Sequence, residues 1–151
     1  GGFCTSINSS TSLRYGDPSL VEGAYYLWRY DEVARVLPAD LLDLFCFHYG
    51  IVPEGNIPPE AVQPHMAGRN IPTWTRPLIE TAAHFSMSAK KVRSLLSIGR
   101  AKLLHTRQLS RPKPQVDSKV VLSSNAMMIS TLAIAYQIIG DPVYLSAAEE
   151  A

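Results

Sequence analysis

Apolar residues crowd the chain between residues 126 and 139, where no charged side chain occurs. On a helix drawn through this stretch they fall on every side, a pattern typical of a helix that is buried nearly all round. Gly140 suits the left-handed residue that often follows a helix. Asp141 then fits an N-cap, and Pro142 fits the first position of a second helix. The pattern therefore predicts a buried helix, a tight turn and another helix.

The rest of the pattern predicts a mainly helical chain. Apolar positions spaced by three and four residues indicate four further helices, at 31–37, 39–49, 77–85 and 89–109. We expect Thr75 and Ser88 to cap the last two. Two short segments, 1–5 and 23–28, are expected to pair as a small N-terminal β-hairpin. Residues 51–76 hold five prolines and little periodicity, which predicts a long ordered loop.

Composition adds one local bias. The chain has 151 residues, enough for one domain with a core, and a net charge of only +1. Between residues 88 and 119, however, nine Lys or Arg residues accompany a single acid, Asp117. Three arginines recur there every seven residues, and we expect them along the edge of a buried helix face: Arg93, Arg100 and Arg107. Because the segment holds no aromatic residue, nucleic-acid or polyanion binding through it is the weaker interpretation.

The spacing of the cysteines and histidines does not match a metal or redox site. Cys4 and Cys46 form no C-x-x-C pair, and no histidine spacing completes a zinc site. We expect two buried free thiols and favour an intracellular location, since nothing signals secretion. His48 is expected to close a buried helix end, and we predict no metal and no cofactor. The apolar run at 126–139 is too short for a membrane span.

The ends of the chain suggest a piece of a longer protein. It begins at Gly1 without a Met and stops at Ala151 inside an expected helix. We therefore expect a fragment, with apolar helix faces that need cover from missing domains or from self-association.

Several short motifs then occur in an order that resembles a known family. They are Gly1–Phe3, Glu22–Trp28, Tyr49–Gly50, Gly55–Asn56, Arg69–Asn70, Arg107, Arg111–Pro112, Asp117–Lys119 and Ser123–Ile129. Together they resemble the spermatogenesis-associated, thioredoxin-domain-containing family, known in bacteria as YyaL-like proteins. The resemblance implies a mainly α fold: residues 1–151 would be part of an (α/α)6 toroid of the six-hairpin glycosidase and N-acylglucosamine 2-epimerase type, without the thioredoxin-like domain.

The chain departs from the family pattern where acids are expected. The family's Glu-Asp-Ala-Asp-Ser loop corresponds to residues 7–11, which read Ile-Asn-Ser-Ser-Thr. Its Asp-Asp-Lys corresponds to residues 117–119, where the second acid is Ser118, and its Ser-Trp-Asn-Gly to residues 123–126, without the Trp. Sugar chemistry generally uses carboxylates as acid, base or nucleophile. The losses therefore favour a degenerate lobe without catalysis of its own.

A residual polar cluster remains as the candidate site. Glu22 and Asp117 are the acid–base candidates, and Lys119, Asn125 and Trp28 the ligand-binding candidates. Each also has a structural interpretation: a solvated strand end for Glu22, an ion pair for Asp117 with Lys119, a helix N-cap for Asn125 and core packing for Trp28.

Three functions stay open at this point. The first, which we favour, is a non-catalytic helical lobe that depends on its missing domains or on self-association. The second is a fragment of a carbohydrate-active enzyme, epimerase-like or glycosidase-like, that binds a small carbohydrate. The third is a polyanion binder that uses residues 88–119.

Overall fold

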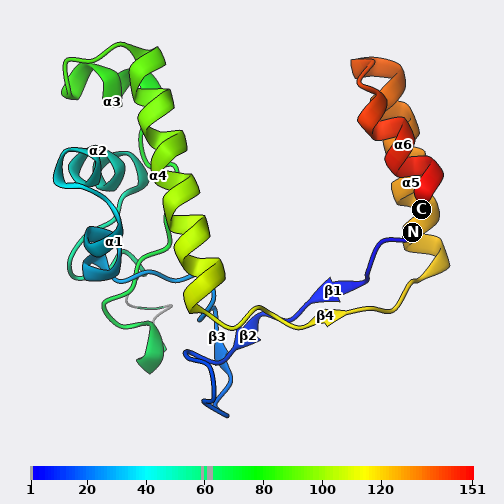
Figure 1. The fold of residues 1–151 in the computed structure, drawn as a ribbon, viewed down its shortest axis with the longest axis horizontal. Helices are drawn as coiled ribbons and strands as arrows, with labels where there is room; N and C mark the ends of the chain where they lie inside the picture. The colour runs from blue at the N-terminus through cyan, green and yellow to red at the C-terminus, as the bar shows by residue number, and fades with distance from the viewer. Residues whose placement is uncertain (1, 59, 61–62) are drawn as a thin grey trace. The chain divides into compact units, whose positions relative to one another are not determined.

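The computed structural model describes residues 2–58, 60 and 63–151. The chain is mainly α-helical, as expected, and forms two compact units. The larger unit is Ser10–Lys113, and the smaller one joins the residues up to Ser9 with Pro114–Ala151. Figure 1 shows that each unit has helices of its own, joined to a short pair of strands. Each unit is described separately below.

Four helices build the core of the larger unit. They are α1 (Tyr30–Val36), α2 (Ala39–Tyr49), α3 (Leu78–His84) and α4 (Ala89–Ser110), with a short 3-10 turn, η2, at Pro64–Met66. The long helix α4 contacts α1, α2 and α3 along its length (Figure 1). Val33, Leu44 and Val92 are fully buried where these helices meet. The predicted apolar faces therefore form one core.

Helices α2 and α4 approach closely at Gly99. A Cβ atom at this position would lie 2.5 Å from the ring of Phe45, well inside van der Waals contact. Only a glycine lets the Phe45 ring pack against the backbone of α4. The helix ends also follow the sequence: α2 stops at Gly50 with φ 64, and the Ser88 hydroxyl accepts a hydrogen bond from Lys91 N.

The predicted cap at Thr75 is wrong. Pro77 is the N-cap of α3. The Thr75 hydroxyl instead donates to the carbonyl of His48, at 3.1 Å, and so ties the end of the long loop to α2. The loop prediction over 51–76 includes residues 59 and 61–62, which lie outside the described residues.

A small β-hairpin exists near the N-terminus, but at other residues than predicted. It pairs β2 (Ser10–Thr11) with β3 (Val21–Glu22), antiparallel. The strand predicted at 23–28 is wrong, because the amides of Tyr26 and Leu27 both donate to the carbonyl of Gly23, at 2.8 and 3.0 Å. These local bonds make a turn and leave the amides unavailable for a partner strand.

The smaller unit combines two strands and two helices. β1 (Ser6–Ile7) pairs antiparallel with β4 (Val116–Asp117). α5 (Leu122–Ile139) and α6 (Pro142–Glu150) follow (Figure 1). The predicted strand at 1–5 is absent from described residues 2–5, and Gly1 lies outside the described residues.

The turn between the two helices of the smaller unit is confirmed. Gly140 has φ 78, and the carboxylate of Asp141 accepts a hydrogen bond from Val143 N at 3.0 Å. Pro142 occupies the first helical position, where its missing amide hydrogen costs nothing.

The prediction that residues 126–139 are buried nearly all round is wrong. Among the described residues of α5, only Asn125 is buried. Met127 is 66% exposed, Ile134 54% and Ile138 79%, because α6 contacts α5 with only nine residues and covers one side. An apolar sequence indicates that a helix needs other residues packed against it, but it does not indicate which residues these are. By length and composition, α5 is also the one described helix that would suffice to cross a membrane.

Both cysteines are free thiols, as predicted, but only Cys46 is buried; Cys4 is exposed. Burial, helped by the negative charge of Asp43, raises the pKa of the Cys46 thiol from 9.0 to about 11. Because the thiolate is the nucleophile, we expect iodoacetamide at pH 8 to modify Cys4 and spare Cys46. The raised pKa also means that folding loses stability as the pH rises from 9 through 11.

Peptide mapping by mass spectrometry after timed alkylation measures both rates. A Cys4→Ser variant removes the fast site, and urea restores the reactivity of Cys46. Fast modification of Cys46 in the folded Cys4→Ser variant at pH 8 would contradict the expectation.

Candidate functional site

Asp117 and Lys119 form an exposed ion pair on and after β4. The ammonium of Lys119 lies 3.4 Å from one carboxylate oxygen of Asp117, and the other oxygen accepts a hydrogen bond from Lys119 N at 3.2 Å. Ser6, Asn8 and Gln115 complete a polar depression of about 540 Å³ around them. An exposed pair of this kind is worth about 1 kcal/mol or less. Both contacts of the Asp117 carboxylate thus come from Lys119, two residues along the same loop.

Asn125 uses its whole amide within the smaller unit. Its oxygen accepts from Phe3 N at 2.6 Å, and its nitrogen donates to the carbonyls of Phe3 and Val121 at 3.1 and 3.0 Å. The N-cap interpretation is wrong, since α5 begins at Leu122 after the N-cap Val121. Asn125 acts instead as a peptide-like partner that fastens the N-terminal segment to the first turns of α5.

Glu22 ends β3 in the larger unit, with an exposed side chain. Its backbone carbonyl, not its carboxylate, accepts a hydrogen bond from the ring of His65 at 3.1 Å. Glu22 and the other acid–base candidate, Asp117, belong to different units.

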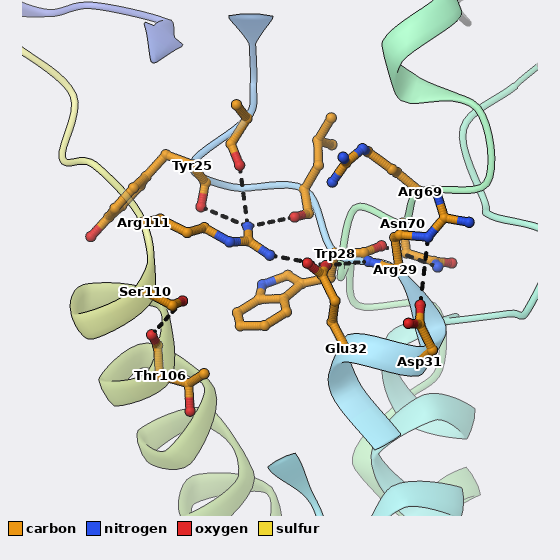
Figure 2. A network of polar contacts seen from close by, with 12 residues as sticks. Tyr25, Trp28, Arg29, Asp31, Glu32, Arg69, Asn70, Thr106, Ser110 and Arg111 are labelled. Carbon is orange, nitrogen blue, oxygen red and sulfur yellow. Dashed lines mark hydrogen bonds and ion pairs between the residues drawn. The ribbon is translucent and has the colours of Figure 1, made fainter. Parts of the chain in front are cut away.

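Trp28 is a core residue, only 4% exposed. The guanidinium of Arg111 lies over its ring, 4.2 Å from the ring centroid (Figure 2). The backbone of Trp28 exchanges two hydrogen bonds with that of Asn70, at 3.0 and 2.6 Å. The structure thus surrounds this candidate with protein.

Arg111 is the centre of the most extensive buried polar network described. One of its terminal nitrogens, Nη1, donates to three carbonyls, those of Ala24, Tyr25 and Leu27, at 3.2, 3.1 and 2.6 Å. The other, Nη2, pairs with the carboxylate of Glu32 at 3.0 Å. Figure 2 shows the guanidinium between these carbonyls and Glu32. The turn after Gly23 directs the three carbonyls toward Nη1, whose two hydrogens they share, while the planar guanidinium keeps Nη2 directed at Glu32.

The buried positive charge of Arg111 is balanced by the carboxylate of Glu32. Burial lowers the pKa of its guanidinium, and the nearby Glu32 opposes that shift. Glu32 in turn accepts Arg29 N at 2.8 Å and so caps α1. One carboxylate therefore joins the start of α1 to the end of α4. The network therefore holds the backbone of residues 24–27 in place, and the side chains of Arg111 and Glu32 are occupied by each other.

Asn70 completes the same region and is fully buried. Its side chain exchanges hydrogen bonds with the amide and the carbonyl of Val52, at 2.9 and 3.0 Å. It fastens both sides of the long loop to the turn that holds Trp28. Among the described residues, no group of His, Cys, Asp and Glu side chains has the arrangement of a metal site.

No protein-family model matches the chain. The chain is similar to spermatogenesis-associated protein 20. The human protein is 34% identical over 150 residues, which cover 93% of this chain and 19% of that protein. The rat protein is 35% identical over the same shares, and the mouse protein is 32% identical over 144 residues, 89% of this chain and 18% of the relative. The chain spans about a fifth of the length of these curated relatives.

The similarity to spermatogenesis-associated protein 20 covers most of both units, since it extends over 93% of the chain. The sequence singled out Arg69–Asn70 and Arg111–Pro112 only as parts of a resemblance, and it predicted Glu32 only as an acid in the first turn of a helix, favourable for the helix dipole. A signal was present: an acid in the first turn of a helix and an arginine at the end of a long apolar face. Their pairing depends on the turn at 23–27, which the pattern did not predict.

Proposed function

We propose that this chain is a non-catalytic helical lobe of a larger protein similar to spermatogenesis-associated protein 20. In this proposal its helices belong to an (α/α)6 toroid, as the family resemblance implies, and α5 is covered by other helices of that protein. Its relatives are about five times as long as the chain, so their remaining residues offer ample helical surface for this.

The observation that carries the proposal is an uncovered apolar stripe on α5. Met127, Ile134 and Ile138 are more than half exposed, and their spacing of seven and four residues places them on one side of the helix. Such a stripe on a chain of this size marks an interaction surface.

Helical protein is a better cover for this stripe than lipid. With 18 residues, α5 is long enough to enter a bilayer, so its polar residues and their bonds decide between the two covers. Six of its residues are Ser, Thr, Asn or Gln, and Asn125 is bonded to the backbone of Phe3. A polar tie of this kind suits a helix packed inside a protein.

The positions of the candidate residues support the absence of catalysis. Asn125 and Trp28 are buried and engaged with the chain itself, and Asp117 is paired with Lys119. Of the candidate residues, only Glu22 has an exposed carboxylate without a partner among the described residues. A single carboxylate does not supply the pair that glycoside hydrolysis uses.

Sedimentation velocity tests the proposal on the isolated chain. We expect self-association at micromolar concentration, because the α5 stripe has no cover. The double variant Ile134→Glu/Ile138→Glu should be monomeric with unchanged helical circular dichroism, since charged side chains at the stripe resist burial.

The matched control is Ser118→Glu/Ser146→Glu, which adds the same charge to exposed polar positions of the smaller unit outside α5 and should associate like the original chain. A stable monomer for the original chain would overturn the proposal. So would flotation of a monomeric chain with neutral phosphatidylcholine vesicles, which would make lipid the cover.

A further inference from the structure

We propose that a cavity in the larger unit binds a small anion that also carries a hydroxyl group, of the class of phosphate monoesters of small polyols. The cavity lies between α2, the segment before α3, and α4, and measures about 580 Å³. That volume falls within the roughly 300–1,000 Å³ of small-molecule sites. Neither the candidate residues above nor the Arg111 network lines it.

The lining carries an excess of positive charge. Three arginines line the cavity: Arg76, Arg93 and Arg100. Among the described residues, no carboxylate lines it. Arg76 is occupied, because it pairs with Glu80 at 3.4 Å and lies over the ring of Phe47. Arg93 and Arg100 are exposed and form no hydrogen bond or ion pair with a described residue.

The two unpaired arginines face the same space. They are seven residues apart on α4, two helical turns, with Leu96 of the cavity wall between them. Guanidinium groups bind phosphate and carboxylate oxygens through charge-assisted hydrogen bonds. Two such groups at one cavity without a protein partner point to an anion from outside the chain.

His48 supplies a second, independent observation. Its ring lines the cavity and is 1% exposed, yet Nε2 has no hydrogen-bond partner among the described residues. The other nitrogen, Nδ1, lies 2.8 Å from the Thr81 hydroxyl, which itself donates to the carbonyl of Pro77. The hydroxyl therefore accepts from Nδ1, and Nε2 of the neutral ring is left as a bare acceptor.

A bare buried acceptor beside two cations selects the chemistry of the ligand. Burial, and then the positive charge of Arg100, lower the pKa of the His48 ring, so both favour its neutral form. A neutral acceptor calls for a hydroxyl donor, because a buried acceptor without a donor is destabilising. A ligand with an anionic group for the arginines and a hydroxyl for His48 satisfies both. Because Nε2 is almost inaccessible in this structure, the hydroxyl reaches it with a small shift of the ring or of its neighbours.

Trp74 gives the site a wall and an optical signal. The indole is 77% exposed, lines the cavity and stands edge-on to the His48 ring at 6.2 Å. A ligand in the cavity would change its surroundings. The other tryptophan, Trp28, is buried away from the cavity lining, so a Trp28→Phe background isolates the Trp74 fluorescence.

Titration with glycerol 3-phosphate tests the proposal, by Trp74 fluorescence and by calorimetry. We expect saturable binding that weakens about tenfold or more in Arg93→Gln/Arg100→Gln. Methyl phosphate, which has no hydroxyl group, should bind more weakly than glycerol 3-phosphate. In His48→Asn, whose amide keeps a donor for Thr81 but removes Nε2, that preference should disappear.

The matched control is Lys90→Gln/Lys102→Gln, which removes two exposed charges from α4 outside the cavity and should leave the affinity within about twofold. An equal loss in both double variants would overturn the proposal in favour of general polyanion attraction by α4. No saturable binding of either ester in the millimolar range would also overturn it.

Circular dichroism confirms that each variant is folded. Sedimentation does not enter this test, so its outcome is distinct from that of the α5 experiment.

Discussion

Replacing Arg111 by Met is expected to lower the free energy of unfolding of the larger unit by about 3 kcal/mol. The substitution removes a buried cation that serves three carbonyls and the carboxylate of Glu32. Breaking a buried pair from one side costs about 3–5 kcal/mol. The lower end applies because the Glu32 side chain remains 30% exposed and regains water. Urea unfolding followed by tryptophan fluorescence reports this unit, since both tryptophans lie in it.

Two further variants separate geometry from charge. Arg111→Lys keeps the cation but not the planar fork, and we expect it to recover less than half of the loss. Lys113→Met removes an exposed cation two residues away and should change stability by less than about 0.5 kcal/mol. If Arg111→Met were no more harmful than Lys113→Met, the network would have no structural role.

The helices were predictable because their signals are local. The apolar face of α2, with Gly50 after it, gave both its bounds, and Ser88 marked the start of α4. Periodicity of three and four residues fixes which side chains face a core. It does not depend on what the other side of the core is.

Features set by distant residues were not predictable. Aromatic residues at 23–28 favour a strand by propensity. Local hydrogen bonds to the carbonyl of Gly23, and hydrogen bonds from Arg111 to the carbonyls of Ala24 and Tyr25, stabilise a turn there instead. The apolar composition of α5 demanded cover, yet the described residues supply it on one side only. At 23–28 a tertiary partner thus helps to override a local preference, whereas for α5 the sequence indicates the need for cover without indicating the residues that provide it.

The candidate site was predictable in its residues more than in their roles. The ion pair of Asp117 with Lys119 and the core position of Trp28 follow their structural interpretations. Asn125 has a role that neither interpretation named, because its partner, Phe3, is 122 positions away. The cavity beside His48 was not found, since it is built from three separate segments. The seven-residue spacing of Arg93 and Arg100 was its one visible trace.

Asn70→Ala is expected to cost the larger unit about 2–4 kcal/mol. The substitution leaves both the amide and the carbonyl of Val52 without their partner; Asn70 is fully buried and Val52 is half-buried. Each buried polar group left unsatisfied costs about 1–3 kcal/mol. The loop should loosen as well, so amide hydrogen exchange at Val52 should accelerate along with the drop in the urea midpoint.

Asn56 offers a matched comparison in the same loop. Its side chain makes the same kind of bonds, donating to the carbonyls of Gly50 and Ile71 and accepting from Ile71 N, but it is only partly buried. Water can replace these bonds, so Asn56→Ala should cost about 1 kcal/mol. An equal loss in the two variants would show that burial does not set the cost. A larger loss for Asn70 would show that this residue anchors the loop through its bonds to Val52.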